Sequence, residues 1–196
     1  MKKGLALFDF DGTITTHDTL LEIIKYQKGK SFFYFGFLIL SPVMILYKLK
    51  LIPNWRAKEI MLAFFFGGDQ LAEFQHKCDA FIAVRLPALL RKEALQKIEW
   101  HLSNQDRVIV VTASSYNWVE KWCTSMNIEL IATRLKVKND RITGKLASVN
   151  CHGMEKVNRI KAYLEIKDFT PIYAYGDTAG DKEMLTLADH AFYRKF

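Results

Sequence analysis

Residues 5–15 have the sequence LALFDFDGTIT, in which a short apolar run ends in two aspartates and a glycine. This pattern is typical of a buried strand of a parallel sheet that passes into a loop. Asp9 and Asp11 stand two positions apart at that exit, so both carboxylates can face one loop cavity while Phe10 points into the core. The stretch therefore predicts paired carboxylates at a strand end.

Strand and helix patterns alternate in the second half of the chain. Strand, helix, strand, helix in this order favours an α/β fold with a doubly wound, mainly parallel, Rossmann-like sheet covered on both faces. The predicted strands are 107–112, 128–133, 171–175 and 191–193, the predicted helices are 116–126, 153–165 and 180–187, and a hairpin is predicted at 135–146 with its turn at Asn139-Asp140.

The segment between the first strand and residue 101 keeps a helical pattern throughout. A capping-box match at residues 19–22 opens its first helix. We therefore predict an α/β core formed by residues 1–15 and 102–196, and an all-helical cap formed by residues 16–101 and inserted after the first strand. The expected helix breaks are Ser41-Pro42, Pro53-Asn54 and Gly67-Gly68.

Residues 31–47, SFFYFGFLILSPVMILY, are uncharged. Their number falls short of the roughly 20 residues of a membrane-spanning helix. We expect a buried helical pair, broken at Ser41-Pro42. The alternative is an apolar surface beside Trp55 and a group of cations, which suits the boundary between lipid headgroups and acyl chains. The cations are Lys48, Lys50, Arg56 and Lys58, and the side chains whose exposure separates the two alternatives are Phe32, Phe35, Leu38 and Leu46.

The composition is that of an ordinary globular protein, with 50% apolar and 25% charged residues among 196. The net charge of +7 favours an anionic partner, such as a phosphate compound, an acidic lipid surface or a nucleic acid. The cysteines, Cys78, Cys123 and Cys151, have no spacing typical of zinc or disulfides. They indicate reduced thiols, so we expect a cytoplasmic protein, with association to a membrane surface as an open alternative.

Asp9 and Asp11 suit phosphoryl transfer. One carboxylate can attack a phosphoryl group, but the leaving oxygen must then gain a proton and the incoming water must later lose one. A second carboxyl group within reach can do both. Two acids so close repel each other, which favours a bound cation. Gly12 lets the backbone approach a phosphate closely.

Further polar residues follow the other predicted strands. Thr112 ends the second strand, and Asp177 and Asp181 follow a later one. Ligands bind beyond the carboxyl ends of such strands, so we expect these side chains to meet. Asp177 facing Asp9 would suit Mg²⁺, which prefers oxygen ligands. Thr112 and Lys156 could hydrogen-bond and neutralise the transferred phosphoryl oxygens.

Four segments resemble, in order, the four motifs of the haloacid dehalogenase-like (HAD) hydrolase superfamily: LALFDFDGTIT, VIVVTASS, CHGMEKVNRI and IYAYGDTAGDKEML. The insertion after the first motif is similar to the helical cap of subfamily IB, the branch that includes phosphoserine phosphatases. The resemblance covers nearly the whole chain. It implies a Mg²⁺-dependent phosphatase that hydrolyses a phosphate monoester through an aspartyl-phosphate intermediate.

The resemblance also implies roles for individual residues. Asp9 would be the nucleophile and Asp11 the general acid and base. Asp9, the backbone carbonyl of Asp11 and Asp177 would hold Mg²⁺, while Asp181 would support a metal-bound water or Lys156. Dehalogenases of the superfamily lack a carboxylate at the position of Asp11, which favours phosphate over halide. The implied phosphate-binding residues are Gly12, Thr112, Ala113 and Lys156.

The chain departs from the phosphoserine phosphatase pattern at several positions. Asp18 stands where those enzymes have a glutamate that helps to recognise the substrate amine. Ala113-Ser114 replaces a glycine pair, and Gly180 replaces an asparagine. Candidates for their substrate-binding cap arginine are Arg56 and Arg85. These departures argue against serine phosphate, and they leave Asp18, Arg56 and Arg85 as the candidate substrate-binding residues.

Other functions remain open. The apolar cap segment resembles the corresponding part of C-type phosphatidylglycerophosphate phosphatases, which implies a lipid phosphate at a membrane surface as an alternative substrate. A phospho-accepting signalling receiver also combines an aspartyl-phosphate, Mg²⁺, Thr and Lys, although Asp9 ends the first strand rather than a central one. A phosphomutase, or a basic binding module without catalysis, is a further alternative. The expected partners are a small phosphorylated substrate and, as an open alternative, a peripheral membrane contact; no nucleic acid is expected.

Overall fold

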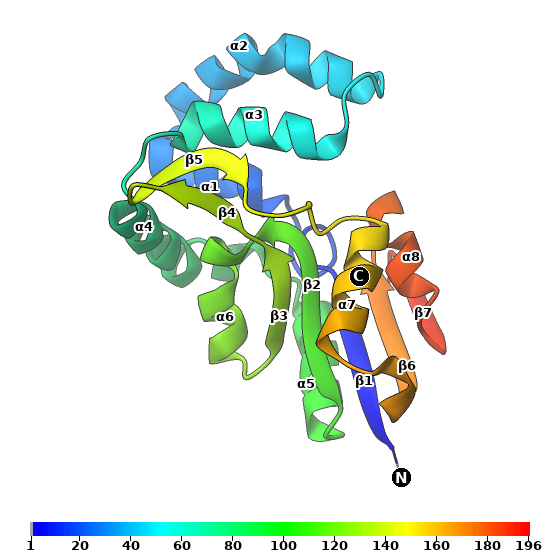
Figure 1. Ribbon diagram of the computed structural model, residues 1–196. Helices are drawn as coiled ribbons and strands as arrows, with labels where there is room; N and C mark the ends of the chain where they lie inside the picture. Colours follow the sequence, from blue (N-terminus) through cyan, green and yellow to red (C-terminus); the bar gives the residue numbers. More distant parts are fainter. Residues whose placement is uncertain (1) are drawn as a thin grey trace.

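In the computed structural model, which describes residues 2–196, a sheet of five parallel strands forms the centre of the molecule (Figure 1). Its strand order is β3-β2-β1-β6-β7. The predicted α/β class with a parallel sheet is thereby confirmed. The strands are β1 (Lys3–Phe8), β2 (Arg107–Ser115), β3 (Glu129–Thr133), β6 (Phe169–Gly176) and β7 (His190–Tyr193).

Strand β1 is first in the chain but central in the sheet, so the premise that Asp9 does not end a central strand is wrong; both edges and both faces of β1 are covered. It pairs with β2 on one side and with β6 on the other. Ala6 and Phe8 belong to one hydrophobic cluster, whereas Leu5 and Leu7 belong to the other, and all four are fully buried. A strand buried on both faces needs a continuous apolar run rather than an alternating one.

Helices cover both faces of the sheet. On the face of Phe8 pack α5 (Lys92–Ser103) and α6 (Glu120–Ser125), and on the face of Leu7 pack α7 (Met154–Tyr163) and α8 (Lys182–Leu185). Short 3₁₀ turns precede several elements. They are η1 (Leu86–Leu89), η2 (Tyr116–Trp118), η3 (Ile166–Asp168) and η4 (Ala179–Asp181), so the predicted helices at 116–126 and 180–187 each divide into a 3₁₀ turn and a short α-helix.

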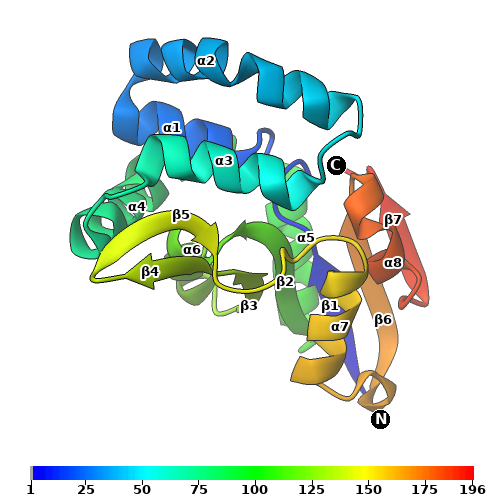
Figure 2. The ribbon, with the colours of Figure 1, turned by 45° about the horizontal axis from the view of Figure 1, so that its top comes forward.

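Four helices stand above the carboxyl ends of the strands (Figures 1 and 2). They are α1 (Thr19–Lys28), α2 (Lys30–Lys48), α3 (Asn54–Phe66) and α4 (Leu71–Val84). The division of the chain into core and cap stays a prediction; within the predicted cap range, α5 packs against the sheet.

A hairpin follows β3 in the chain and packs against α3. Its strands are β4 (Leu135–Lys138) and β5 (Arg141–Leu146), and Asn139 and Asp140 form the turn with φ of 50° and 56°, as the sequence predicts. Strand β5 lies against α3 so closely that a Cβ atom at Gly144 would come within 2.2 Å of the Ala63 Cα. Gly144, with φ of +77°, therefore allows the hairpin to support α3 from below.

The start of α1 differs from the predicted capping box. The N-cap is Asp18, not Thr19: the Asp18 carboxylate accepts hydrogen bonds from the backbone N–H groups of Leu20 (2.9 Å) and Leu21 (3.3 Å). Thr19 is buried and is free to bond elsewhere.

The predicted break at Ser41-Pro42 is wrong, because α2 continues through Pro42 as one helix. A proline lacks the N–H that would bond to the carbonyl four residues earlier, here that of Leu38. The Ser41 hydroxyl donates to the Leu38 carbonyl at 2.7 Å and replaces the missing bond.

The expectation that α2 is buried is also wrong. Of its residues only Phe33, Gly36 and Leu40 are buried. The four side chains that separate the two alternatives are all exposed: Phe32 by 42%, Phe35 by 56%, Leu38 by 72% and Leu46 by 39%. The physical reason is that α2 packs against α1 and α3 on one side, and no described element covers its outer side.

Candidate active site

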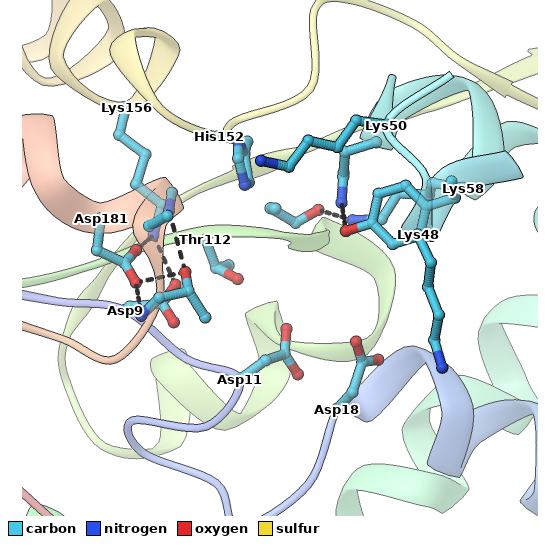
Figure 3. A pocket seen from close by; sticks show the side chains of 16 residues that line it. Asp9, Asp11, Asp18, Lys48, Lys50, Lys58, Thr112, His152, Lys156 and Asp181 are labelled. Carbon is cyan, nitrogen blue, oxygen red and sulfur yellow. Dashed lines mark hydrogen bonds and ion pairs between the residues drawn. The ribbon is translucent and has the colours of Figure 1, made fainter. Parts of the chain in front are cut away.

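A cavity of about 610 Å³ lies beyond the carboxyl ends of β1, β2 and β6 (Figure 3). The strand ends supply Asp9, Asp11 and Thr112, and Lys156 reaches the same end from α7. The sequence placed these residues together because parallel strands end at one edge of the sheet. The opposite wall comes from α2, α3 and the loop between them.

Lys156 is the buried cation of the site. It lies in the first turn of α7, whose N-cap is Gly153, and its side chain is 2% exposed. Its Nζ atom donates to Asp9 Oδ1 (2.6 Å), to Asp181 Oδ1 (2.6 Å) and to the Val111 carbonyl (2.7 Å). All three ammonium protons are therefore used. Burial alone would lower the pKa of Lys156, but the two carboxylates hold that pKa above its ordinary value.

Asp9 is buried at the end of β1. Burial raises the pKa of Asp9, Lys156 lowers it and the charge of Asp181 raises it, and together they bring this pKa to about 7. Lys156 contacts only Oδ1, and no hydrogen bond from residues 2–196 is formed to Oδ2. This second oxygen is available to a substrate or a cation.

The Asp11 carboxylate is held by donors from two other elements. Its Oδ1 accepts from the Thr19 backbone N–H (2.7 Å) and from the Thr19 hydroxyl (2.6 Å), and its Oδ2 accepts from the Ser114 hydroxyl. The Trp118 indole N–H donates to the Thr19 hydroxyl at 3.1 Å. The beginning of α1 and the end of β2 thus fix the orientation of Asp11, a role of Thr19 and Ser114 that the sequence did not reveal.

Asp177 follows β6 and lies beside the loop of the first motif. The Thr13 hydroxyl donates to Asp177 Oδ1 at 3.2 Å. A Cβ atom at Gly12 would come within 2.3 Å of Asp177 Oδ2, so Gly12, with φ of +82°, lets this carboxylate approach the loop. Burial and the charge of Asp181 raise the pKa of Asp177.

The acidic residues fit a hard divalent cation. One carboxylate oxygen each of Asp9, Asp177 and Asp181 lies within 4.8 Å of the others. Asp181, however, already bonds Lys156 through Oδ1, and through Oδ2 it accepts from the backbone N–H and hydroxyl of Thr178, each at 2.9 Å. Burial tends to raise the pKa of Asp181, but Lys156 and Thr178 hold that pKa below its ordinary value.

The Asp11 backbone carbonyl accepts no backbone hydrogen bond from residues 2–196. The groups free to bind a cation are therefore this carbonyl and the carboxylates of Asp9 and Asp177, with Asp181 as their support. Oxygen ligands of this kind suit Mg²⁺.

The predicted phosphate-binding residues of the second motif lie at the same end of β2. Thr112 is fully buried, and its Oγ1 accepts from the Ser114 backbone N–H at 2.9 Å. Ala113 lines the cavity, and its carbonyl accepts from Lys58 Nζ at 2.9 Å. Lys58 thereby connects α3 to the strand that carries Thr112.

Of the three candidate substrate-binding residues, only Asp18 lines the cavity. Arg85 does not, because its guanidinium pairs with Glu22 of α1 (Nη2–Oε2 2.8 Å). Arg56 is exposed on α3 and also lies outside the lining of the cavity. The two arginines are thus not placed to contact a substrate in this cavity.

The basic residues that do line the cavity are lysines. Lys48, Lys50 and Lys58 line the wall opposite Asp9 and Asp11 (Figure 3). The sequence pointed to these lysines only as neighbours of the apolar segment, because their approach to the cavity depends on how α2 turns into α3. Neither Lys48 nor Lys50 forms a side-chain hydrogen bond or ion pair within the described part of the chain.

His152 is a further lining residue that the sequence did not single out. A Cβ atom at Gly180 would lie 2.3 Å from His152 Nε2. The departure from the phosphoserine phosphatase pattern at Gly180 therefore makes room for the imidazole. Burial and the charge of Lys156 lower the pKa of His152, which favours the neutral ring.

Replacement of Lys156 should destabilise the protein as well as inactivate it. The Lys156→Met substitution leaves two buried carboxylates without their cation, and loss of one partner of a buried pair costs about 3–5 kcal/mol. Urea unfolding measures the change, with the exposed Lys161→Met on the same helix as the control. A Lys156→Met variant within about 0.5 kcal/mol of the wild type would contradict this account.

Comparisons with known proteins agree with the motifs. A family model described as haloacid dehalogenase-like hydrolase matches residues 6–186. The chain is 34% identical over 194 residues to the protein CicA of Caulobacter vibrioides, which covers 98% of this chain and 86% of CicA.

Two solved structures share the fold. A protein of unknown function from Bordetella pertussis Tohama I superposes with a TM-score of 0.83 at 22% identity, over 96% of this chain and 88% of that one. An apo phosphoserine phosphatase superposes with a TM-score of 0.67 at 18% identity, over 95% and 84% of the respective chains.

Proposed function

Since the chain belongs to the haloacid dehalogenase-like hydrolase family, we propose that it is a Mg²⁺-dependent phosphatase that hydrolyses a phosphate monoester through an aspartyl-phosphate at Asp9. The observation that carries the proposal is the joint approach of Asp9, Asp11, Thr112 and Lys156, from separate elements, to one end of a single cavity.

The residues of the site divide the reaction between them. Asp9 Oδ2, which has no hydrogen-bond partner among residues 2–196, attacks phosphorus; the bond to the leaving oxygen breaks, and Asp11 protonates that oxygen. Asp11 then takes a proton from a water, which attacks phosphorus and releases the Asp9 carboxylate. Lys156 and Thr112 stabilise charge on the phosphoryl oxygens. Mg²⁺, when bound by Asp9, Asp177 and the Asp11 carbonyl, would supply further positive charge there.

Metal dependence tests the proposed site. Phosphate release from a panel of phosphate monoesters should require Mg²⁺ and stop on addition of EDTA, and Ca²⁺ should support it poorly because its larger coordination sphere positions nucleophile and phosphate badly. Full activity after exhaustive chelation would exclude the proposed metal site.

We also propose that the substrate carries a second anionic group. The cavity extends from the aspartates to a wall with Lys48, Lys50 and Lys58, of which only Lys58 has a protein acceptor among the described residues. The ammonium groups of Lys48 and Lys50, which have no partner among residues 2–196, suit a second phosphate, a phosphodiester or a carboxylate on the part of the substrate that does not react.

Substitution of Lys50 tests this second charge. The Lys50→Ser variant should lower kcat/KM for a phosphate ester with a second anionic group by about fivefold, since an exposed ion pair contributes up to about 1 kcal/mol. The kcat/KM for a phosphate ester of a neutral alcohol should not change. Lys138→Ser, which removes an exposed lysine of β4 outside the cavity, is the matched control. Equal losses for both esters would contradict a specific role for Lys50.

A lipid-phosphate phosphatase is the second candidate function. The exposed outer side of α2 favours it. If the apolar residues of the cap served only as its core, this side would be covered. The same panel, with lipid phosphates presented in vesicles, separates the two. Preferential hydrolysis of the vesicle lipids supports the lipid candidate, whereas turnover of soluble esters alone supports the general one.

A further inference from the structure

Helix α2 and the loop after it carry an unusually large exposed apolar surface. Helix α2 is the outermost element of the molecule in Figures 1 and 2. By length and composition it could cross a membrane, yet only 17% of its most apolar window is buried. We call the exposed apolar residues of this segment, together with Trp55 at the start of α3, the α2 surface: Phe32, Tyr34, Phe35, Leu38, Ile39, Ile45, Leu46, Tyr47, Leu49, Leu51 and Trp55.

The charges around the α2 surface have one sign. Between Glu22 and Glu59 the sequence has no acidic residue and seven basic ones. Lys25 and Lys28 pair with acids outside the segment. Lys58 bonds the Ala113 carbonyl in the cavity. The remaining cations precede and follow the apolar run and are exposed: Lys30, Lys48, Lys50 and Arg56. An apolar helix side with cations at its ends and Trp and Tyr beside them has the composition of a helix that lies in a membrane interface.

The connections of α2 exclude a crossing of the bilayer. Helix α2 packs against α1 before it and α3 after it. Helix α1 also packs against α4, and α3 packs against the β5 strand of the hairpin, so both neighbours belong to the same folded body. A spanning α2 would place α1 and α3 on opposite sides of the membrane and break these contacts. With these contacts intact, only the exposed side of α2 is available to a partner.

We propose that the α2 surface docks onto an anionic lipid bilayer. Tyr47, Lys48 and Lys50, at the end of α2, also line the cavity. Docking therefore brings the mouth of the cavity to the level of the phosphate headgroups. The proposal deepens the proposed function, since it gives that site a substrate from the class of phosphorylated amphiphiles.

Charge favours a bilayer over a second copy of the chain. Two copies joined through their α2 surfaces would bring together two sets of cations on chains that each carry +7. Anionic headgroups neutralise the same cations, while the side chains of the α2 surface enter the acyl boundary.

Co-sedimentation with vesicles tests the proposal. The full chain should sediment with phosphatidylcholine vesicles that contain phosphatidylglycerol, much less with phosphatidylcholine alone, and less at high salt. The double variant Phe35→Gln/Leu38→Gln should lower the partition coefficient by at least about tenfold, because it removes two side chains that enter the apolar boundary. Val84→Gln/Val137→Gln, at exposed apolar positions of α4 and β4, is the matched control and should bind like the wild type.

Hydrolysis of p-nitrophenyl phosphate with Mg²⁺, measured on the same samples, keeps the two proposals apart. Phe35 and Leu38 do not line the cavity, so this soluble activity should be equal in all variants. A protein that hydrolyses the soluble ester but stays in the supernatant with anionic vesicles overturns the docking proposal alone. A concentration-dependent dimer that the double variant abolishes, without vesicle binding, assigns the surface to a second copy and also overturns it. Vesicle binding without phosphatase activity overturns the proposed function alone.

Discussion

The Asp9→Asn variant should lose phosphate release by about three orders of magnitude or more, the loss expected when a nucleophile is removed. An amide cannot form the acyl phosphate, and the metal site loses a carboxylate ligand. The amide oxygen can still accept the hydrogen bond from Lys156 that Oδ1 accepts in the wild type, so the fold should persist. Steady-state phosphate release from p-nitrophenyl phosphate measures the effect.

The control for this substitution is Asp168→Asn, which changes an exposed aspartate of η3 outside the cavity. It should retain wild-type activity. Near-normal turnover by Asp9→Asn, with a thermal transition like that of the wild type, would show that the covalent mechanism is wrong.

The Asp11→Asn variant should slow both formation and breakdown of the aspartyl-phosphate, because proton transfer contributes about 10²–10⁴-fold. The amide can keep the local geometry: its oxygen can accept from the Thr19 N–H and hydroxyl, and its NH₂ can donate to Ser114, whose hydroxyl can rotate. The loss would therefore report on proton transfer rather than on displacement of the side chain.

Rapid-quench kinetics with an activated ester separates the two steps, since a good leaving group needs little protonation. Under these conditions formation should recover and breakdown should stay slow. An unchanged rate of hydrolysis of the trapped intermediate would remove Asp11 from the role of general base.

The sequence predicts the sheet and one end of the cavity because their signals are local. The apolar run of β1 reflects burial on both faces, and Asn139-Asp140 can adopt the positive φ of the hairpin turn. Asp9, Asp11 and Asp177 each follow a strand, and parallel strands end at one edge. The topology alone therefore brings these three acids together.

The cap is predicted less well because its outcome depends on distant partners. The break expected at Pro42 is absent since Ser41 satisfies the carbonyl that proline leaves free. Arg85 pairs with Glu22, which is 63 positions earlier in the chain, and does not line the cavity. A helix that is apolar all round is normally buried, so the sequence of α2 favours burial, and its exposure becomes visible only in the structure.

Peptide mapping of the phosphorylated protein during a single turnover tests the central claim most directly. With Mg²⁺ and a labelled phosphate ester, acid-quenched samples should show phosphate on Asp9 that rises and then falls as inorganic phosphate appears. Release of phosphate with no labelled Asp9 peptide at any time, or a stoichiometric label that never turns over, would contradict an aspartyl-phosphate phosphatase.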